Sequence, residues 1–168
     1  MIARLLALLI LACLATSAEA QVFWSVPASR CVPDEATIKF DRHSVGNASV
    51  QHAAGNVDLI VLVCPITSFS TAATQWAFGF TYCDSTGTNT QASIRARLFR
   101  MALGSANPKL LAQANSNSSA ETGLSTVESP AFTHTFDFEA NMYWVIVELD
   151  RATTNQTVIL HSIRLDLT

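Results

Sequence analysis

Apolar side chains recur at every second position through most of this chain, and this period constrains the fold more than any other feature. The clearest example is segment 75–82, in which Trp76, Phe78, Phe80 and Tyr82 alternate with other residues. Successive side chains of a strand point to opposite faces, so the four aromatic rings share one face. The segment therefore predicts a strand with one broad apolar face.

Similar patterns predict about eight or nine strands at spacings of about 8 to 14 residues. Further predicted strands lie at 37–41, 57–64, 92–98, 124–128, 132–138, 142–149 and 156–167. Helix signals are nearly absent, and residues 104–123 have the Ser, Asn and Ala content of a loop, in which Leu110 and Leu111 could mark a short strand or turn. The chain therefore predicts an all-β fold, a two-sheet sandwich of antiparallel strands and of the jelly-roll or Greek-key type. The last two strands are predicted to pair, because the polar segment 150–155 has the length of a hairpin connection.

The first twenty residues read as a signal peptide. A positive start ending at Arg4 is followed by an apolar run, and Ala18-Glu19-Ala20 has the small residues that signal peptidase requires. This pattern predicts removal of residues 1–20 and a single domain at 21–168 that is secreted or periplasmic. In the alternative reading, Cys13 becomes a lipid anchor. No later segment approaches the ~18 to 20 apolar residues of a transmembrane helix.

Composition and charge limit the classes of partner. Hydrophobic residues make up 49% of the chain and charged residues 14%, which is the composition of a folded domain rather than of a disordered chain. The net charge of -3 does not favour nucleic acid as a partner. Arg95, Arg97 and Arg100 come closest to a basic patch, and alternation on a strand places the first two on one solvated face.

Three cysteines follow the leader: Cys31, Cys64 and Cys83. An oxidising compartment favours one disulfide and one free thiol. Cys31 with Cys64 is the preferred pair, and Cys64 with Cys83 is the alternative. A zinc site is disfavoured, because no two cysteines have ligand spacing.

Signals for catalysis are weak, and the sequence favours a protein that is not an enzyme. No G-x-S-x-G motif is present. Asp137 with Glu139, and Glu148 with Asp150, are carboxylate pairs that a glycosidase could use, but solvated strand ends explain them equally well. No cofactor is predicted apart from a possible structural calcium ion, for which the candidate ligands are Asp34, Glu35 and Asp166.

Three tryptophans are candidates for ligand binding: Trp24, Trp76 and Trp144. Exposed aromatic rings on a sandwich can stack on sugar rings. Core packing is the competing interpretation for Trp76 and Trp144. Trp24 could pack as part of an added strand or dock onto a partner.

Three stretches together resemble a known group of proteins: Val61-Leu62-Val63-Cys64-Pro65, Phe80-Thr81-Tyr82-Cys83-Asp84, and the run from Tyr143 to Arg151. The chain resembles uncharacterised secreted bacterial β-sandwich proteins of unknown function. This resemblance implies the sandwich fold and assigns no chemistry. We therefore expect a non-catalytic secreted or periplasmic protein that binds a glycan or a surface protein. A carbohydrate-binding module is the first alternative, and a small extracellular hydrolase is the second.

Overall fold

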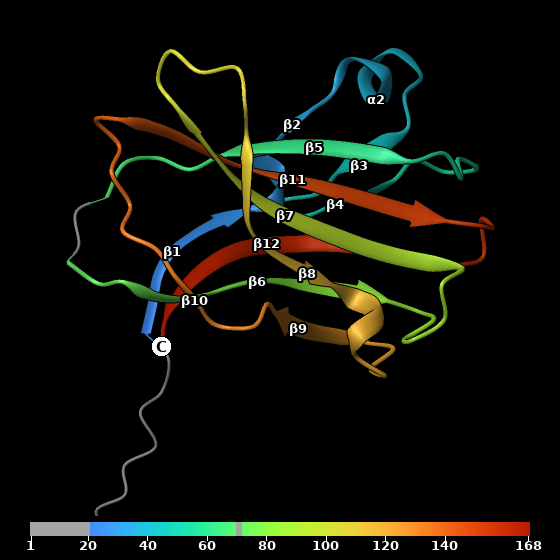
Figure 1. Cartoon of the computed structure of the whole chain (residues 1–168). Helices are drawn as coiled ribbons and strands as arrows, with labels where there is room; N and C mark the ends of the chain where they lie inside the picture. Colours follow the sequence, from blue (N-terminus) through green and yellow to red (C-terminus); the bar gives the residue numbers. More distant parts are fainter. Residues whose placement is uncertain (1–20, 70–71) are drawn as a thin grey trace, which may run out of the picture.

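A computed structural model describes residues 21–69 and 72–168. The predicted leader and the alternative lipid anchor at Cys13 lie outside these residues. The described chain forms two antiparallel sheets, one of seven strands and one of five, which confirms the predicted two-sheet β-sandwich. Figure 1 shows β5, β11 and β7 side by side, with β12 and β6 following one another below them.

The seven-stranded sheet follows the order β10-β6-β12-β4-β3, with β1 paired to β12 and β9 paired to β6. Its longest strands are β6 and β12, which are paired along most of their length. Figure 1 shows the C-terminus beside the start of β1, as this pairing requires. The strands are β1 (Gln21–Pro27), β3 (His43–Val45), β4 (Val50–His52), β6 (Gln75–Asp84), β9 (Leu124–Glu128), β10 (Phe132–Thr133) and β12 (Val158–Leu167).

The five-stranded sheet follows the order β2-β5-β11-β7-β8, so β2 and β8 are its edge strands. Its strands are β2 (Val32–Pro33), β5 (Ile60–Pro65), β7 (Ala92–Ala102), β8 (Lys109–Asn115) and β11 (Asn141–Arg151). Among the described residues, three short helical segments occur outside the sheets: η1 (Ala28–Arg30), α2 (Glu35–Lys39) and η2 (Ser116–Ser118).

The core lies between the two sheets. The four aromatic rings predicted to share one face of β6 are all completely buried there. Alternate residues of β5, β7 and β11 close over them from the other sheet, and these are also buried. Full burial of one large apolar side chain contributes about 1.5 to 3 kcal/mol. Because apolar side chains alternate along the strands, each sheet has one apolar face, and the two apolar faces pack together to form the core.

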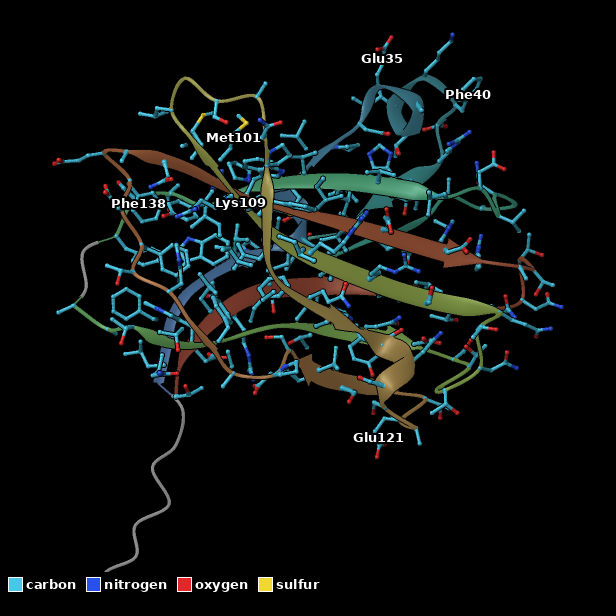
Figure 2. The ribbon with its side chains drawn as sticks, in the orientation of Figure 1. Glu35, Phe40, Met101, Lys109, Glu121 and Phe138 are labelled. Atoms are coloured by element: carbon cyan, nitrogen blue, oxygen red, sulfur yellow. A yellow bond between two sulfur atoms is a disulfide. The ribbon has the colours of Figure 1, made fainter. Side chains whose placement is uncertain are left out.

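Aromatic rings close one end of this core. Phe69, Phe136 and Phe138 pack against one another, with ring centroids 5.0 to 6.0 Å apart. Trp76 contacts Phe136 at 5.0 Å. The Tyr143 ring completes the group, 4.9 Å from Phe138. Figure 2 shows Phe138 among several rings at this end of the sandwich.

Cys31 and Cys64 form a disulfide, as the sequence predicts. It joins the segment before β2 to the end of β5, and both half-cystines are buried. Cys83 is the free cysteine of the described chain. The alternative pairing of Cys64 with Cys83 is therefore not the one formed.

The predicted strand at 37–41 is wrong, because this segment belongs to α2 and the turn after it. Asp34 caps the helix: its carboxylate accepts a hydrogen bond from the Thr37 backbone N–H at 2.7 Å. A capping carboxylate satisfies one of the free donors in the first helical turn, and here it outweighs an alternating pattern only five residues long. The predicted strand at 57–64 begins later, at Ile60.

The predicted pairing of the last two strands is also wrong. Strand β11 belongs to the five-stranded sheet and β12 to the seven-stranded sheet, so the polar segment between them crosses from one layer to the other. Arg151 supports this crossing by donating hydrogen bonds to the backbone carbonyls of Asn56 and Gln156. Two smaller differences concern strand length. Strand β8 has seven residues where a loop with at most a short strand at Leu110 and Leu111 was expected, and only Phe132–Thr133 of segment 132–138 forms a strand.

Candidate functional site

The outer face of the five-stranded sheet carries large and charged side chains. Residues directly opposite each other in antiparallel strands share a face, so the strand register defines rows across this surface. The first row is Pro65, Trp144, Phe99 and Leu110; the second is Val63, Ile146, Arg97 and Gln113; the third is Val61, Glu148, Arg95 and Asn115. Successive rows are about 7 Å apart along the strands.

Trp144 and Phe99 form an aromatic platform in the first row. Their rings are stacked, with centroids 5.8 Å apart and an angle of 17° between the planes. Both side chains are only partly buried. Leu110, beside Phe99 on the edge strand, is 50% exposed. The first row therefore presents a half-exposed apolar surface that the core of the sandwich does not use.

Ionic groups lie directly beside the aromatic platform. Arg97 donates a hydrogen bond to the Glu148 carboxylate, and the Arg95 guanidinium lies 3.7 Å from the other oxygen of that carboxylate. The guanidinium carbon of Arg97 is 5.8 Å from the centre of the Phe99 ring. This places strong donors and a strong acceptor next to an aromatic surface.

A hollow of about 560 Å³ continues from these rows around the edge strand β8. Arg95, Arg97 and Leu110 line it together with the amide side chains of Gln113 and Asn115. Its volume lies within the range of about 300 to 1,000 Å³ that is usual for small-molecule sites. The platform and the hollow share Leu110 as a neighbour, so one extended ligand could contact both.

The three predicted tryptophans have different positions. Trp76 is completely buried, and its indole N–H donates to the His134 carbonyl at 2.8 Å, so it belongs to the core. Trp24 lies on β1 of the other sheet and donates to the Thr67 hydroxyl at 3.3 Å. Only Trp144 lies on the outer face of the five-stranded sheet, so the structure does not gather the three into one site.

Asp34, Glu35 and Asp166, the predicted calcium ligands, belong to different layers. Asp34 caps α2 and Glu35 lies in its first turn, next to the five-stranded sheet. Asp166 lies on β12 and is 1% exposed, with its carboxylate 2.7 Å from the Arg164 guanidinium. In residues 21–69 and 72–168, no group of three or more His, Cys, Asp or Glu side chains is arranged to hold a metal ion.

A second polar hollow, of about 540 Å³, lies at the start of β12, beside Val158 and Ile159, and includes His52 and Arg151. The Arg151 guanidinium is engaged by backbone carbonyls, including those of Ala53 and Asn56. The Nε2 atom of His52 lies 3.1 Å from the Asp58 carbonyl. Because these side chains hold loops together, the hollow offers fewer free groups to a ligand than the outer face of the five-stranded sheet.

Cys83 and His161 lie close together on the seven-stranded sheet, with the sulfur 3.7 Å from Nε2. Burial raises the pKa of the Cys83 thiol. A raised pKa leaves the thiol protonated at neutral pH, and a thiol is a far weaker nucleophile than a thiolate. The arrangement therefore does not resemble an activated Cys–His pair.

In each of the two carboxylate pairs considered for hydrolysis, one member is engaged in structural contacts. Asp137 accepts hydrogen bonds from the backbone N–H groups of Glu139 and Ala140, which closes the turn before β11. Glu148 lies between two arginines, and the next outward residue, Asp150, is exposed near the end of the strand. Neither pair lines one of the hollows described above.

Phe99 was not singled out in the sequence, although its position carries a signal. Ala92, Ile94, Ala96 and Leu98 mark the inward parity of this strand, which makes Phe99 an outward aromatic residue. Trp144 was a candidate from its residue type, but the apolar residues on both sides of it left open whether its side chain faces outward. Cross-strand register is needed to bring the two together.

Comparison with known proteins finds weak structural likeness only. No family model and no curated protein matches the sequence. The chain is similar to the CBM36-1 domain of a multidomain xylanase from the hindgut metagenome of Trinervitermes trinervoides, at 11% identity and a TM-score of 0.42, over 84% of this chain and 94% of that domain. A xylan-binding module, CBM15, aligns at 17% identity and a TM-score of 0.41, over 75% of this chain and 82% of the module.

A family two carbohydrate esterase from Cellvibrio japonicus aligns at 12% identity and a TM-score of 0.42, over 89% of this chain. The chain spans only 35% of that esterase. At these identities and TM-scores, the comparisons carry no argument about function. Within residues 21–69 and 72–168, no helix has the length and apolar character needed to cross a bilayer.

Proposed function

We propose that this protein is a non-catalytic carbohydrate-binding module and that its ligand lies on the outer face of the five-stranded sheet. One observation carries the proposal: the stacked, partly exposed Trp144–Phe99 pair has strong hydrogen-bonding side chains in the next row. Two aromatic rings left outside the core, on a surface that also carries polar groups, are the arrangement expected of a binding face.

The chemistry of a sugar matches this surface. The apolar C–H groups of a sugar ring pack well on an aromatic face, while its hydroxyl groups need donors and acceptors nearby. The platform would provide the first contact. The Arg97–Glu148 pair and Gln113, in the rows that follow, would provide the second. Because the rows continue along the strands and into the hollow beside β8, we infer that the ligand is a chain rather than a single sugar.

The test is binding to polysaccharides by Trp144→Ala and Phe99→Ala variants. Removal of a central aromatic contact typically costs 2 kcal/mol or more of binding free energy, so we expect Kd to rise by at least about 10-fold for each variant. Affinity electrophoresis in gels that contain soluble polysaccharides, followed by calorimetry on the best ligand, measures this change.

Phe40→Ala is the matched control. Phe40 is an aromatic residue that is 55% exposed, and Figure 2 shows it on the helical segment that projects from the sandwich. We expect this variant to bind as the unchanged protein does. Retention of full affinity by both platform variants would contradict the proposal, as would failure of the folded protein to bind any polysaccharide in a broad glycan panel.

We also propose that the domain acts after export, with residues 1–20 removed. The buried Cys31–Cys64 disulfide supports this, because such bonds persist in oxidising compartments. Mass spectrometry of the protein from its own cells should give a chain that begins at Gln21. A retained leader would contradict the proposal, and a lipid on Cys13 would replace free export with membrane anchoring.

A further inference from the structure

The outer face of the five-stranded sheet continues beyond the aromatic platform. Met142 of β11 lies directly opposite Met101 of β7. Each methionine is two residues from a platform residue on its own strand, so both share the face of Trp144 and Phe99, in a row about 7 Å away. Figure 2 marks Met101 near the end of β7. We call this row and the first row together the apolar end of the face: Met101, Met142, Pro65, Trp144, Phe99 and Leu110.

The apolar end lacks the groups that pair with hydroxyls. Apart from the indole N–H of Trp144, none of its side chains carries a strong hydrogen-bonding group. Met142 is nevertheless 45% exposed and Leu110 is 50% exposed. An apolar group that covers such a surface removes its own atoms and those of the protein from water, which is favourable. Beyond the platform, the face therefore favours an apolar part of a ligand over a further sugar ring, whose hydroxyl groups would find no partners there.

The polar rows begin on the other side of the platform. Arg97 and Gln113 lie in the second row, and Arg95, Glu148 and Asn115 lie in the third. Both arginines pair with Glu148, so donors and acceptors lie together in these rows. Such a set suits hydroxyl groups, which donate and accept hydrogen bonds. The face therefore changes from apolar to polar along β7 and β11, and the platform lies at the boundary.

The apolar end is too small to be the interface of a stable protein dimer. Even when Val63 and Ile146 of the second row are included, it covers four strands and three rows, or about 14 Å in each direction. A stable dimer needs about 800 Å² from each partner, which is several times this area. Methionine side chains are flexible and adapt to irregular apolar shapes. The size and softness of the apolar end fit an alkyl or acyl chain.

We propose that the face binds an amphiphilic glycan, which is a sugar that carries an alkyl or acyl substituent. The substituent covers Met101 and Met142, the sugar ring contacts the platform, and the sugar hydroxyls bond to the Arg97–Glu148 pair. This inference rests on the proposed carbohydrate-binding function and adds an apolar substituent to the ligand. Because both parts belong to one molecule, affinity should depend on the sugar and on the length of the chain.

The experiment compares maltose with hexyl, octyl and decyl maltoside by calorimetry, each below its critical micelle concentration. The four compounds share one sugar and differ only in the alkyl chain. We expect Kd to fall about 2- to 4-fold for each CH₂ group that the apolar end covers, and to level off once the chain is longer than the apolar end.

Substitution of the methionines tests whether the apolar end holds the chain. Met101→Gln and Met142→Gln keep the length of the side chain and introduce an amide, so each should raise Kd for decyl maltoside at least about 5-fold and leave maltose unaffected. Leu124→Gln is the matched control, because Leu124 is an apolar residue of β9 in the other sheet and is 70% exposed. It should change neither value.

Substitution in the polar rows should have the complementary effect. Arg97→Gln should weaken maltose and the three maltosides by a similar factor, so the gain in affinity for each CH₂ group should stay the same. Equal affinity for decyl maltoside and for decyl dimethylamine oxide, which has the same chain and no sugar, would overturn the inference.

Other occupants of the apolar end give different results. Binding to phosphatidylcholine vesicles that contain no glycan would assign the apolar end to a bilayer and overturn the inference. A dimer in sedimentation velocity that Met142→Gln dissociates would assign it to a second copy of the chain, which would also overturn the inference.

Failure of this inference can be distinguished from failure of the proposed function. Equal Kd values for maltose and the three maltosides, together with binding of a polysaccharide, would overturn the amphiphilic ligand and leave the carbohydrate-binding function intact. If the folded protein, with the circular dichroism spectrum of a β-protein, binds no polysaccharide and no maltoside, the carbohydrate-binding function itself fails.

Discussion

The five-stranded sheet exposes aromatic and ionic side chains on its outer face, whereas the seven-stranded sheet keeps its largest aromatic ring and several of its ionisable groups out of solvent. Trp144, Arg95 and Arg97 remain accessible on the first sheet. On the second, Trp76 is 0% exposed, His52 5% and Asp166 1%. Both sheets carry aromatic and ionisable residues. The difference in their exposure therefore depends on which face of the strand each side chain occupies and on whether other segments cover that face.

Small residues explain the outer side of β6. Ala77 and Gly79 lie opposite Asp166 and Arg164 of β12. A Cβ atom at Gly79 would lie only 2.7 Å from the Val127 carbonyl oxygen, so no side chain larger than hydrogen fits there. Strand β6 therefore directs its large side chains inward to build the core, while β11 and β7 direct some of theirs outward, where they are accessible to solvent.

Removal of each tryptophan in turn should give the largest difference between the two sheets. Trp76→Ala should lower the free energy of unfolding by about 3 to 5 kcal/mol, because it leaves a cavity in a closed core. Trp144→Ala should cost about 1 kcal/mol, because its ring is partly solvated already. Urea denaturation monitored by circular dichroism measures both values. Similar losses for the two variants would show that the outer face of the five-stranded sheet is covered.

Acid pH should have a smaller effect on stability, through buried His52 of the seven-stranded sheet. Burial, followed by the charge of Arg151, lowers the pKa of His52 from 6.5 to about 4. Nε2 donates to the Asp58 carbonyl and Nδ1 is buried without a hydrogen-bond partner in the described chain, so protonation would add a buried charge. Between pH 6.5 and 4 the unfolded chain binds a proton that the folded chain does not, and stability falls as the pH decreases.

This loss should be about 2 to 3 kcal/mol for His52 across that window and should be absent above it. His52→Gln, which retains an N–H donor and does not titrate, is the control. Chemical denaturation at pH 7 and at pH 4.5 should show a smaller difference between the two pH values for this variant than for the unchanged protein. An identical difference in both proteins would assign the acid sensitivity to other groups.

The sequence was sufficient to predict the layers of the fold but not the way in which they connect. The alternation around Trp76 correctly predicted a strand with one buried face, and the Cys31–Cys64 pair followed from compartment and position. The crossing between β11 and β12 was missed, because a polar segment of hairpin length can also join two sheets. Helix α2 was missed, although the cap at Asp34 is a signal that local reasoning could have used.

The candidate site was harder to predict than the core. Burial depends on parity within one strand, which is visible in the sequence, whereas the platform depends on register between strands that are more than forty residues apart. Trp144 was a candidate from its residue type alone, and Phe99 became one only when the register placed it opposite.

The free thiol of Cys83 has a practical consequence. It lies on the seven-stranded sheet, in the layer opposite the aromatic platform, and it is the unpaired cysteine of the described chain. A maleimide or gold tether at this atom would attach every molecule in one orientation, with Trp144 and Phe99 directed toward the solution. Because burial raises the pKa of this thiol, coupling should proceed faster under mildly alkaline conditions.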